Sequence, residues 1–203
     1  MDQKKSLSLL FLIPAVSVIA IPTPVHVDVY KVDVNSSKIE WFAEKVTGKH
    51  NGTIKLSSGE IHNNHGQLGG KFSIDMTTIT VSDLTGEKKG KLENHLKSDD
   101  FFGVQKHPSS EFEITSVKPR SGVVAGEPNF DVTGRLTIKG ITNEISFPAL
   151  IKFEGPKITA KGEAKVDRSK FDVRYGSKTF YEDIGDRAIY DEFILKIDLV
   201  ANR

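Results

Sequence analysis

The sequence contains no cysteine, which excludes disulfides, thiolate metal sites, cysteine nucleophiles and an acylated lipoprotein cysteine. Its formal net charge is only +1, so it offers neither the basic field that nucleic acid requires nor a polybasic surface for anionic lipid. The G-x-S-x-G, glycine-rich phosphate-loop, H-E-x-x-H and C-x-x-C patterns are also missing. What remains is 203 residues of ordinary globular composition, 37 % hydrophobic and 27 % charged. We predict a single domain that is not an enzyme, binds no nucleic acid and needs no cofactor.

The first twenty residues have the character of a secretory signal peptide. Lys4 and Lys5 precede an apolar run of fourteen residues that ends at Ala20. An uncleaved membrane anchor is the alternative, but the run is shorter than the roughly 20 residues of a spanning helix. We therefore expect cleavage after Ala20 and a periplasmic or secreted product without a stable membrane anchor. The expected organisation is a signal peptide over 1–20, a linker over 21–29 and one domain over 30–203.

Strict alternation of apolar and polar residues dominates the rest of the chain, which is typical of strands with one buried face. Turn signals separate these runs, including those at 49–52 and 63–66. The Lys139-Gly140 connection is so short that the strands on either side must be antiparallel neighbours. The pattern predicts an all-β fold of eight or nine antiparallel strands. The alternating runs cover 39–43, 54–56, 68–77, 112–114, 130–139, 145–153, 158–166 and 193–199, with an entry strand near 30–34.

One segment, 83–107, lacks this alternation and predicts a short helical insertion. Leu92 and Leu96 lie at i and i+4 on one face of a helix expected over 91–97. Ser98 is expected to cap a second turn. The residues that this turn would bring inward are Phe101, Phe102 and Val104.

Closure into a barrel hides the edges of such a sheet completely, and a sandwich is the main alternative. Inward small residues such as Gly70, Gly134 and Gly162 favour a barrel, because they keep a lumen from filling with side chains. They would also fit the taper of a packed core, so a filled interior stays open as an alternative. The residues predicted to line the lumen, all on apolar strand faces, are Ile39, Trp41, Phe72, Ile74, Phe112, Ile114, Phe130, Val132, Leu136, Phe147, Val166, Phe193 and Leu195.

Arg168, Arg174 and Tyr175 follow one predicted strand closely and are candidates for a polar rim. At the mouth of a barrel, each arginine could hold a polar or anionic head group in bidentate fashion. The alternative is a surface network with Asp167 and Asp172, which we favour slightly, because surface arginines usually pair with neighbouring carboxylates.

His50, His62 and His65 lie close together in the sequence, and imidazoles of this kind can bind zinc or copper. We favour the interpretation that these histidines lie at surface turns. We predict no metal site. His95 is expected at the boundary of the helix.

Five stretches together carry a resemblance to a known family. The H-L-K-S-D-D-F-F and V-T-G-R-L-T-I-K-G-I-T blocks are specific in combination, and the resemblance covers 30–201. The chain resembles the YceI-like family of periplasmic lipid- or polyisoprenoid-binding proteins. One departure is Asp172, where the family usually has glycine, and it bears on the local backbone turn. The matching stretches are 30–41, 66–76, 94–108, 130–142 and 167–171.

The resemblance implies an eight-stranded, lipocalin-like antiparallel barrel with a long apolar lumen. It also implies binding of a long-chain amphiphile, such as a polyisoprenoid or a fatty-acid derivative, and it does not imply catalysis. We expect a carrier that is a monomer or a homodimer. Two alternatives stay open: a lipid-modifying enzyme with Arg168, Tyr175 or His95 as catalyst, and a structural or adaptor barrel with a filled core.

Overall fold

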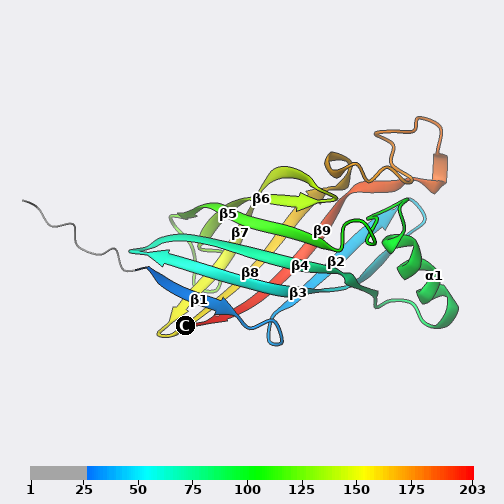
Figure 1. Ribbon diagram of the computed structural model, residues 1–203. Coiled ribbons are helices and arrows are strands. Elements are labelled where there is room, and N and C mark those ends of the chain that lie inside the picture. The colour runs from blue at the N-terminus through cyan, green and yellow to red at the C-terminus, as the bar shows by residue number, and fades with distance from the viewer. Residues whose placement is uncertain (1–26) are drawn as a thin grey trace, which may run out of the picture.

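The computed structural model describes residues 27–203, so the expected signal peptide and most of the expected linker lie outside the described residues (Figure 1). Within 27–203, no helix combines the length and the apolar composition needed to cross a membrane. The elements are β1 (Asp28–Val32), β2 (Lys38–Lys45), β3 (Gly48–Asn64), β4 (Gln67–Val81), α1 (Gly86–Lys97), β5 (Ser109–Pro119), β6 (Phe130–Ile138), β7 (Ile141–Glu154), β8 (Lys157–Asp167), the 3₁₀ turns η1 (Arg168–Phe171) and η2 (Gly185–Arg187), and β9 (Ile189–Asn202).

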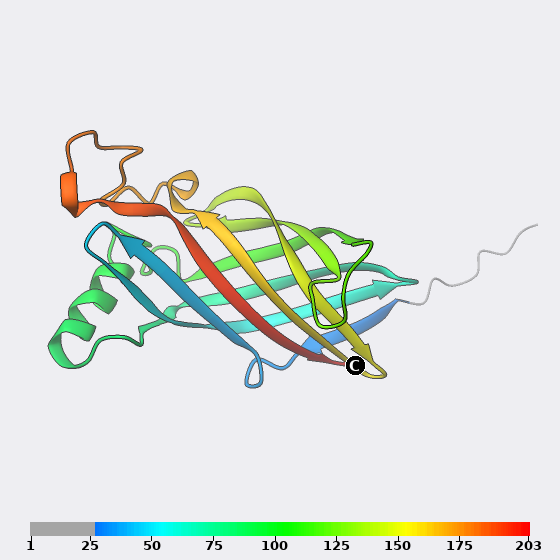
Figure 2. The same cartoon turned by 180° about the vertical axis from the view of Figure 1, so that it is seen from behind.

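The strands form one antiparallel sheet that closes on itself. The sheet runs β3-β2-β9-β8-β7-β6-β5-β4, and β4 pairs again with β3. The short strands β1 and β2 share one position between β3 and β9, because β2 pairs with the first part of β3 and β1 with its last part. The predicted all-β, eight-stranded antiparallel barrel is therefore confirmed, with one position divided between two strands. Figure 2 shows the strands wrapping obliquely around the barrel axis.

The barrel is long and narrow because several of its strands are long. β3 has 17 residues and β4 has 15. At about 3.3 Å per residue and a tilt of about 40°, such strands give a barrel roughly 35–45 Å tall. Residues on the inward faces form one continuous hydrophobic core along this height.

The hairpin between β6 and β7 has the predicted two-residue turn. Ile138 pairs with Ile141, and Lys139 and Gly140 have φ angles of 52° and 75°. Two successive left-handed residues give a turn whose twist matches that of the flanking strands. A two-residue turn also connects β7 to β8, where Glu154 pairs with Lys157.

The prediction of a loop at 49–52 is wrong. These residues lie inside β3, where Lys49 pairs with Glu44 and Gly52 pairs with Trp41, and the reversal occurs at 46–47 instead. Asn51 and Gly52 favour turns locally, but pairing on both sides of the strand outweighs that preference.

The helix is longer than the sequence indicated, since α1 begins at Gly86 rather than at Lys91. Ser98 does not cap a second helical turn; its hydroxyl donates a 2.7 Å hydrogen bond to the His95 carbonyl and closes the end of α1. Irregular turns follow. The expectation that Phe101, Phe102 and Val104 lie inward is confirmed, because all three are buried in the core.

Candidate ligand-binding cavity

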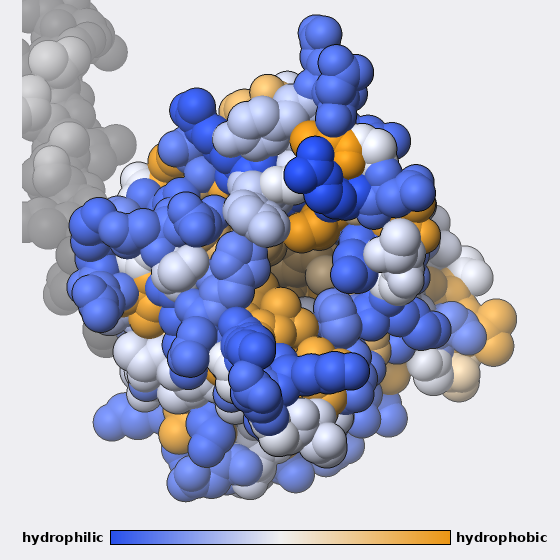
Figure 3. All heavy atoms as spheres, turned by 90° about the vertical axis from the view of Figure 1, so that its right-hand side faces the viewer, coloured by the Kyte–Doolittle hydropathy of each residue, from blue (hydrophilic) through white to orange (hydrophobic). Residues whose placement is uncertain are grey.

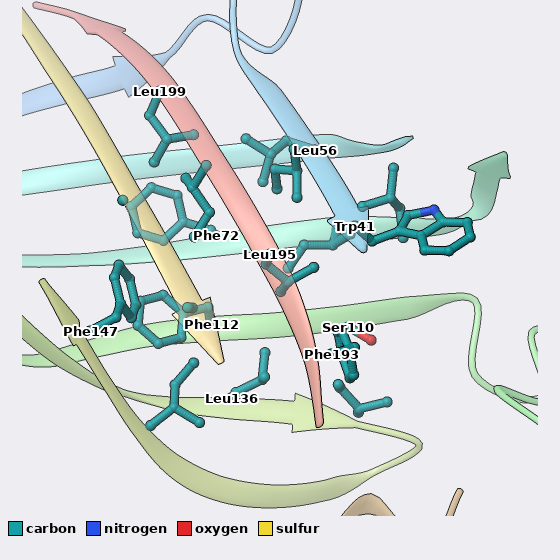
Figure 4. Close-up of a pocket in the computed structure, with 18 of the residues that line it drawn as sticks. Trp41, Leu56, Phe72, Ser110, Phe112, Leu136, Phe147, Phe193, Leu195 and Leu199 are labelled. Carbon is teal, nitrogen blue, oxygen red and sulfur yellow. The ribbon is translucent and has the colours of Figure 1, made fainter. Parts of the chain in front are cut away.

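The interior of the barrel is hollow. A cavity of about 190 Å³ lies along it. Every strand from β2 to β9 contributes apolar side chains to the wall, and Figure 4 shows several of them pointing into the space.

The cavity is visible from the end of the barrel that carries α1. Figure 3 looks onto this end and shows a hollow with apolar walls inside a ring of hydrophilic residues. Leu96, Phe101 and Phe102 line the cavity from α1 and the turns after it, and Ile189 and Tyr190 line it from the start of β9. We call this end the mouth.

The structure places almost all of the predicted lumen residues on the cavity wall. Phe130 and Val166 are the exceptions, because both lie near an end of their strand and pack into the core away from the open space. Contact with a ligand stays a prediction for the whole set. The predicted residues that line the cavity are Ile39, Trp41, Phe72, Ile74, Phe112, Ile114, Val132, Leu136, Phe147, Phe193 and Leu195.

The large aromatic side chains leave the lumen open because glycines on neighbouring strands make room for them. A Cβ added at Gly59 would lie 2.8 Å from the Phe72 ring, and one at Gly134 would collide with the Phe112 ring. A Cβ at Gly52 would lie 2.7 Å from the Trp41 indole. The rings therefore lie along the wall instead of crossing the space. Phe112 also contacts its two aromatic neighbours, Phe72 and Phe147, at centroid distances of 6.3 and 5.9 Å.

Arg168 lines the cavity but is not the accessible rim group that the sequence suggested. Its side chain is only 3 % exposed, and its guanidinium is occupied by the protein itself. It donates hydrogen bonds of 2.8–3.2 Å to the carbonyls of Val173, Tyr175, Ile189 and Tyr190. The planar guanidinium is suited to this task, because its donors point in fixed directions toward several acceptors at once. Arg168 thus joins η1 to the segment that follows it and to the first two residues of β9.

Nearby carboxylates balance the positive charge of the buried Arg168 side chain. Burial lowers the pKa of the guanidinium, and the carboxylates of Asp191 and Asp167 oppose that effect. Its partner is Asp191, at 3.2 Å, rather than the Asp167 considered from the sequence. Thr179 donates a 2.7 Å hydrogen bond to the other oxygen of Asp191, which fixes the pair.

Arg174 and Tyr175 lie outside the lumen. Arg174 is exposed and pairs with Asp172, as the surface-network interpretation predicted, and its guanidinium lies 5.0 Å from the centre of the Phe180 ring. Asp172 itself adopts a left-handed conformation with φ of 57°, which explains why glycine suits this position and why Asp is tolerated. The Tyr175 ring packs edge-on against His95 at 4.3 Å. Neither Arg174 nor Tyr175 is among the residues that line the cavity.

The three histidines considered for a metal are not brought together. His50 and His62 lie toward opposite ends of the 17-residue strand β3, about 40 Å apart at the usual rise per residue. Each has its own carboxylate, Asp83 at 2.8 Å for His50 and Glu60 at 2.9 Å for His62. Within 27–203, no group of three or more His, Asp and Glu side chains is arranged to hold a metal ion.

Sequence reasoning did not place the buried polar residue Ser110 in the lumen. Ser110 lies two residues before Phe112 on the inward face of β5. Because alternate residues of a strand share a face, its position relative to Phe112 would have placed it in the lumen. It was missed because the Pro108-Ser109-Ser110 stretch is typical of a connection rather than of a strand.

A closed antiparallel barrel around an open apolar lumen defines a class of protein whose interior can hold one small or slender ligand. The chain belongs to the YceI-like family, since the family model described as a YceI-like domain matches residues 30–201. It is 29 % identical over 134 residues to a UPF0312 protein of Ectopseudomonas mendocina, a match that spans 63 % of this chain and 62 % of that one. It is 35 % identical over 85 residues to a UPF0312 protein of Pseudomonas putida, across 42 % and 40 % of the two chains. The chain thus matches less than two thirds of the length of these relatives.

Two solved structures share the fold. BcnA of Burkholderia cenocepacia superposes with a TM-score of 0.66 at 23 % identity, across 84 % of this chain and 99 % of that one. A polyisoprenoid-binding domain of Saccharophagus degradans, implicated in plant cell wall breakdown, superposes with a TM-score of 0.61 at 16 % identity, across 85 % and 97 % of the two chains. At these identities the likeness establishes the fold.

Proposed function

We propose that the protein is a periplasmic or secreted carrier that holds one long-chain amphiphile, a polyisoprenoid or a fatty-acid derivative, in its lumen without chemical turnover. The observation that carries this proposal is an open cavity whose wall is almost entirely aliphatic and aromatic. Burial of hydrocarbon gains about 25 cal/mol per Å² of apolar surface, so a chain lying along this wall supplies most of the affinity. A tall, narrow barrel suits an extended chain better than a compact metabolite.

Two further observations support the carrier function. A structural neighbour from Saccharophagus degradans is a polyisoprenoid-binding domain, and it has the same barrel. The basic start and apolar run of residues 1–20 are typical of an exported protein. N-terminal sequencing of the protein from its native host tests the export step: we expect the chain to begin at Ile21, and a membrane-bound chain that begins at Met1 would contradict export.

The alternative functions have less support. Acid–base catalysis on a bound lipid requires a convergent pair of titratable groups within hydrogen-bonding reach of the substrate. No carboxylate or imidazole is found among the residues that line the cavity in the described part of the chain. A purely structural barrel would be filled by its own side chains, whereas this lumen has open space.

Native mass spectrometry of the protein purified from its host, followed by lipid extraction, tests the carrier function directly. We expect one hydrophobic molecule of constant mass per chain. The stripped protein should then bind geranylgeraniol or oleic acid and release either molecule unchanged. A protein that carries no lipid and takes up neither probe, or that converts one of them into a product, contradicts the proposal.

A further inference from the structure

One polar group of the cavity wall is a buried hydroxyl that lies among apolar side chains. Ser110 is only 4 % exposed and lines the cavity. Within residues 27–203, its Oγ has no hydrogen-bond partner. A hydroxyl that no surrounding protein group pairs with can form its hydrogen bond only with a molecule held in the lumen.

Ser110 lies in the half of the barrel near the mouth. It is the second residue of β5, which follows directly on the Phe101–Pro108 turns after α1, and it pairs with Ile74 of β4. Phe112 comes next on the inward face of β5, and Leu136 pairs with Phe112. Figure 4 shows Ser110 as the one oxygen-bearing side chain labelled among these hydrocarbon groups. A ligand whose hydrocarbon tail lies along Phe112, Phe72 and Phe147 would place its polar end next to Ser110.

We propose that Ser110 Oγ is the hydrogen-bonding site of the lumen, and that it selects an amphiphile with a neutral oxygen, such as an alcohol, a ketone or an ester. This inference rests on the proposed carrier function and specifies its ligand class. A hydroxyl both donates and accepts one hydrogen bond, so it pairs with any of these groups. A bare hydrocarbon would leave the hydroxyl unpaired, and the alcohol therefore binds more tightly than the hydrocarbon.

A charged head group is a poor match for this part of the lumen. The guanidinium of Arg168 is already bound to four backbone carbonyls and to Asp191. Lys161, the other cationic residue along the wall, pairs with Asp198 at 2.8 Å and its side chain is exposed. A carboxylate drawn to the depth of Ser110 would lose its hydration without gaining a free cation, which is strongly unfavourable.

The test compares three probes of equal chain length: geranylgeraniol, its parent hydrocarbon and geranylgeranoic acid. Their affinities are measured by displacement of a fluorescent lipophilic dye from the wild type and from Ser110→Ala. In the wild type we expect the alcohol to bind more tightly than the hydrocarbon and than the ionised acid. Ser110→Ala should weaken alcohol binding by about two- to tenfold, the usual effect of one hydrogen bond, and leave hydrocarbon binding unchanged.

Two control variants separate recognition from packing. Ser110→Thr keeps the hydroxyl and should retain most of the preference for the alcohol. Ser109→Ala removes the exposed neighbour on the same strand and should change no affinity. In the absence of ligand, Ser110→Ala should unfold at about the same temperature as the wild type, because the Ser110 hydroxyl is bonded to no other group of the described protein. Loss of a residue with a purely structural role would instead lower the unfolding temperature.

The possible failures are distinguishable. If the wild type binds none of the three probes, both the carrier function and the role of Ser110 are wrong. If the wild type binds alcohol and hydrocarbon equally, or if Ser110→Ala weakens both equally, the carrier function stands and the assignment of Ser110 is overturned.

Discussion

Phe112 lies against Gly134 of the neighbouring strand so closely that a single added Cβ at Gly134 would collide with the edge of the ring. Phe147 has the same relationship with Gly162, where a Cβ would lie 3.1 Å from the ring. In each case the glycine contributes no side chain to the wall, and the aromatic ring of the adjacent strand lies over the glycine backbone. The barrel thereby keeps a large apolar surface facing inward while its centre stays open.

Gly134→Ala should therefore destabilise the protein and disturb the lumen. The new methyl group would meet both the Phe112 ring and the Glu113 carbonyl oxygen, the latter at 2.6 Å, so the strand or the ring must move. Overpacking of this kind costs about 1–3 kcal/mol. Urea denaturation should show that loss, and lipid binding should weaken because Phe112 is displaced toward the cavity.

Gly69→Ala is the matched control for this substitution. Gly69 lies in β4, and a Cβ there would have no heavy atom within 4 Å. The stability of the Gly69→Ala protein should equal that of the wild type or exceed it slightly. Equal stability of the Gly134 and Gly69 variants would show that the ring moves aside without cost.

The fold was predictable because alternation with a period of two depends only on neighbouring residues. The same alternation predicted that Phe72 and Leu136 face the interior of the barrel. It could not show whether that interior was filled or open. The role of Arg168 was not predictable, because its carbonyl acceptors and Asp191 come from a segment up to 23 residues further along the chain. Local sequence likewise could not show that Gly52 belongs to a strand, since its pairing with Trp41 is a tertiary contact.

Trp41 should report ligand binding through its fluorescence. It is the only tryptophan in the sequence, it lines the cavity, and its indole Nε1 donates a 3.0 Å hydrogen bond to the Thr80 carbonyl. A hydrocarbon chain that replaces water in the lumen makes the surroundings of the ring less polar, so the emission should shift to shorter wavelength. Trp41→Phe should bind lipid in native mass spectrometry without this signal. Unchanged emission of the wild type, at a lipid concentration where binding is demonstrated, would place the ligand away from Trp41.

A charge introduced into the lumen should abolish lipid binding or folding. Leu136→Asp places a carboxylate on the cavity wall, where a buried unpaired charge costs several kcal/mol. Circular dichroism distinguishes the two outcomes, and dye displacement measures binding in any folded fraction. Thr137→Asp adds the same charge at the next residue, whose exposed hydroxyl bonds to Thr142 on the outer face, and it should fold and bind normally. Normal binding by Leu136→Asp would contradict an apolar lumen as the ligand site.

Arg168→Ala should act on folding rather than on the choice of ligand. The substitution strips a buried partner from Asp191 and leaves a cluster of backbone carbonyls without donors, and breaking a buried ion pair of this kind costs about 3–5 kcal/mol. Arg168→Lys should recover little of that loss, because one ammonium cannot reach acceptors arranged for a planar guanidinium. Arg174→Ala is the control, since its exposed pair with Asp172 is worth at most about 1 kcal/mol. Urea denaturation of the three variants checks this order. An Arg168→Ala protein of normal stability that loses affinity for anionic lipids alone would instead show that Arg168 binds the head group.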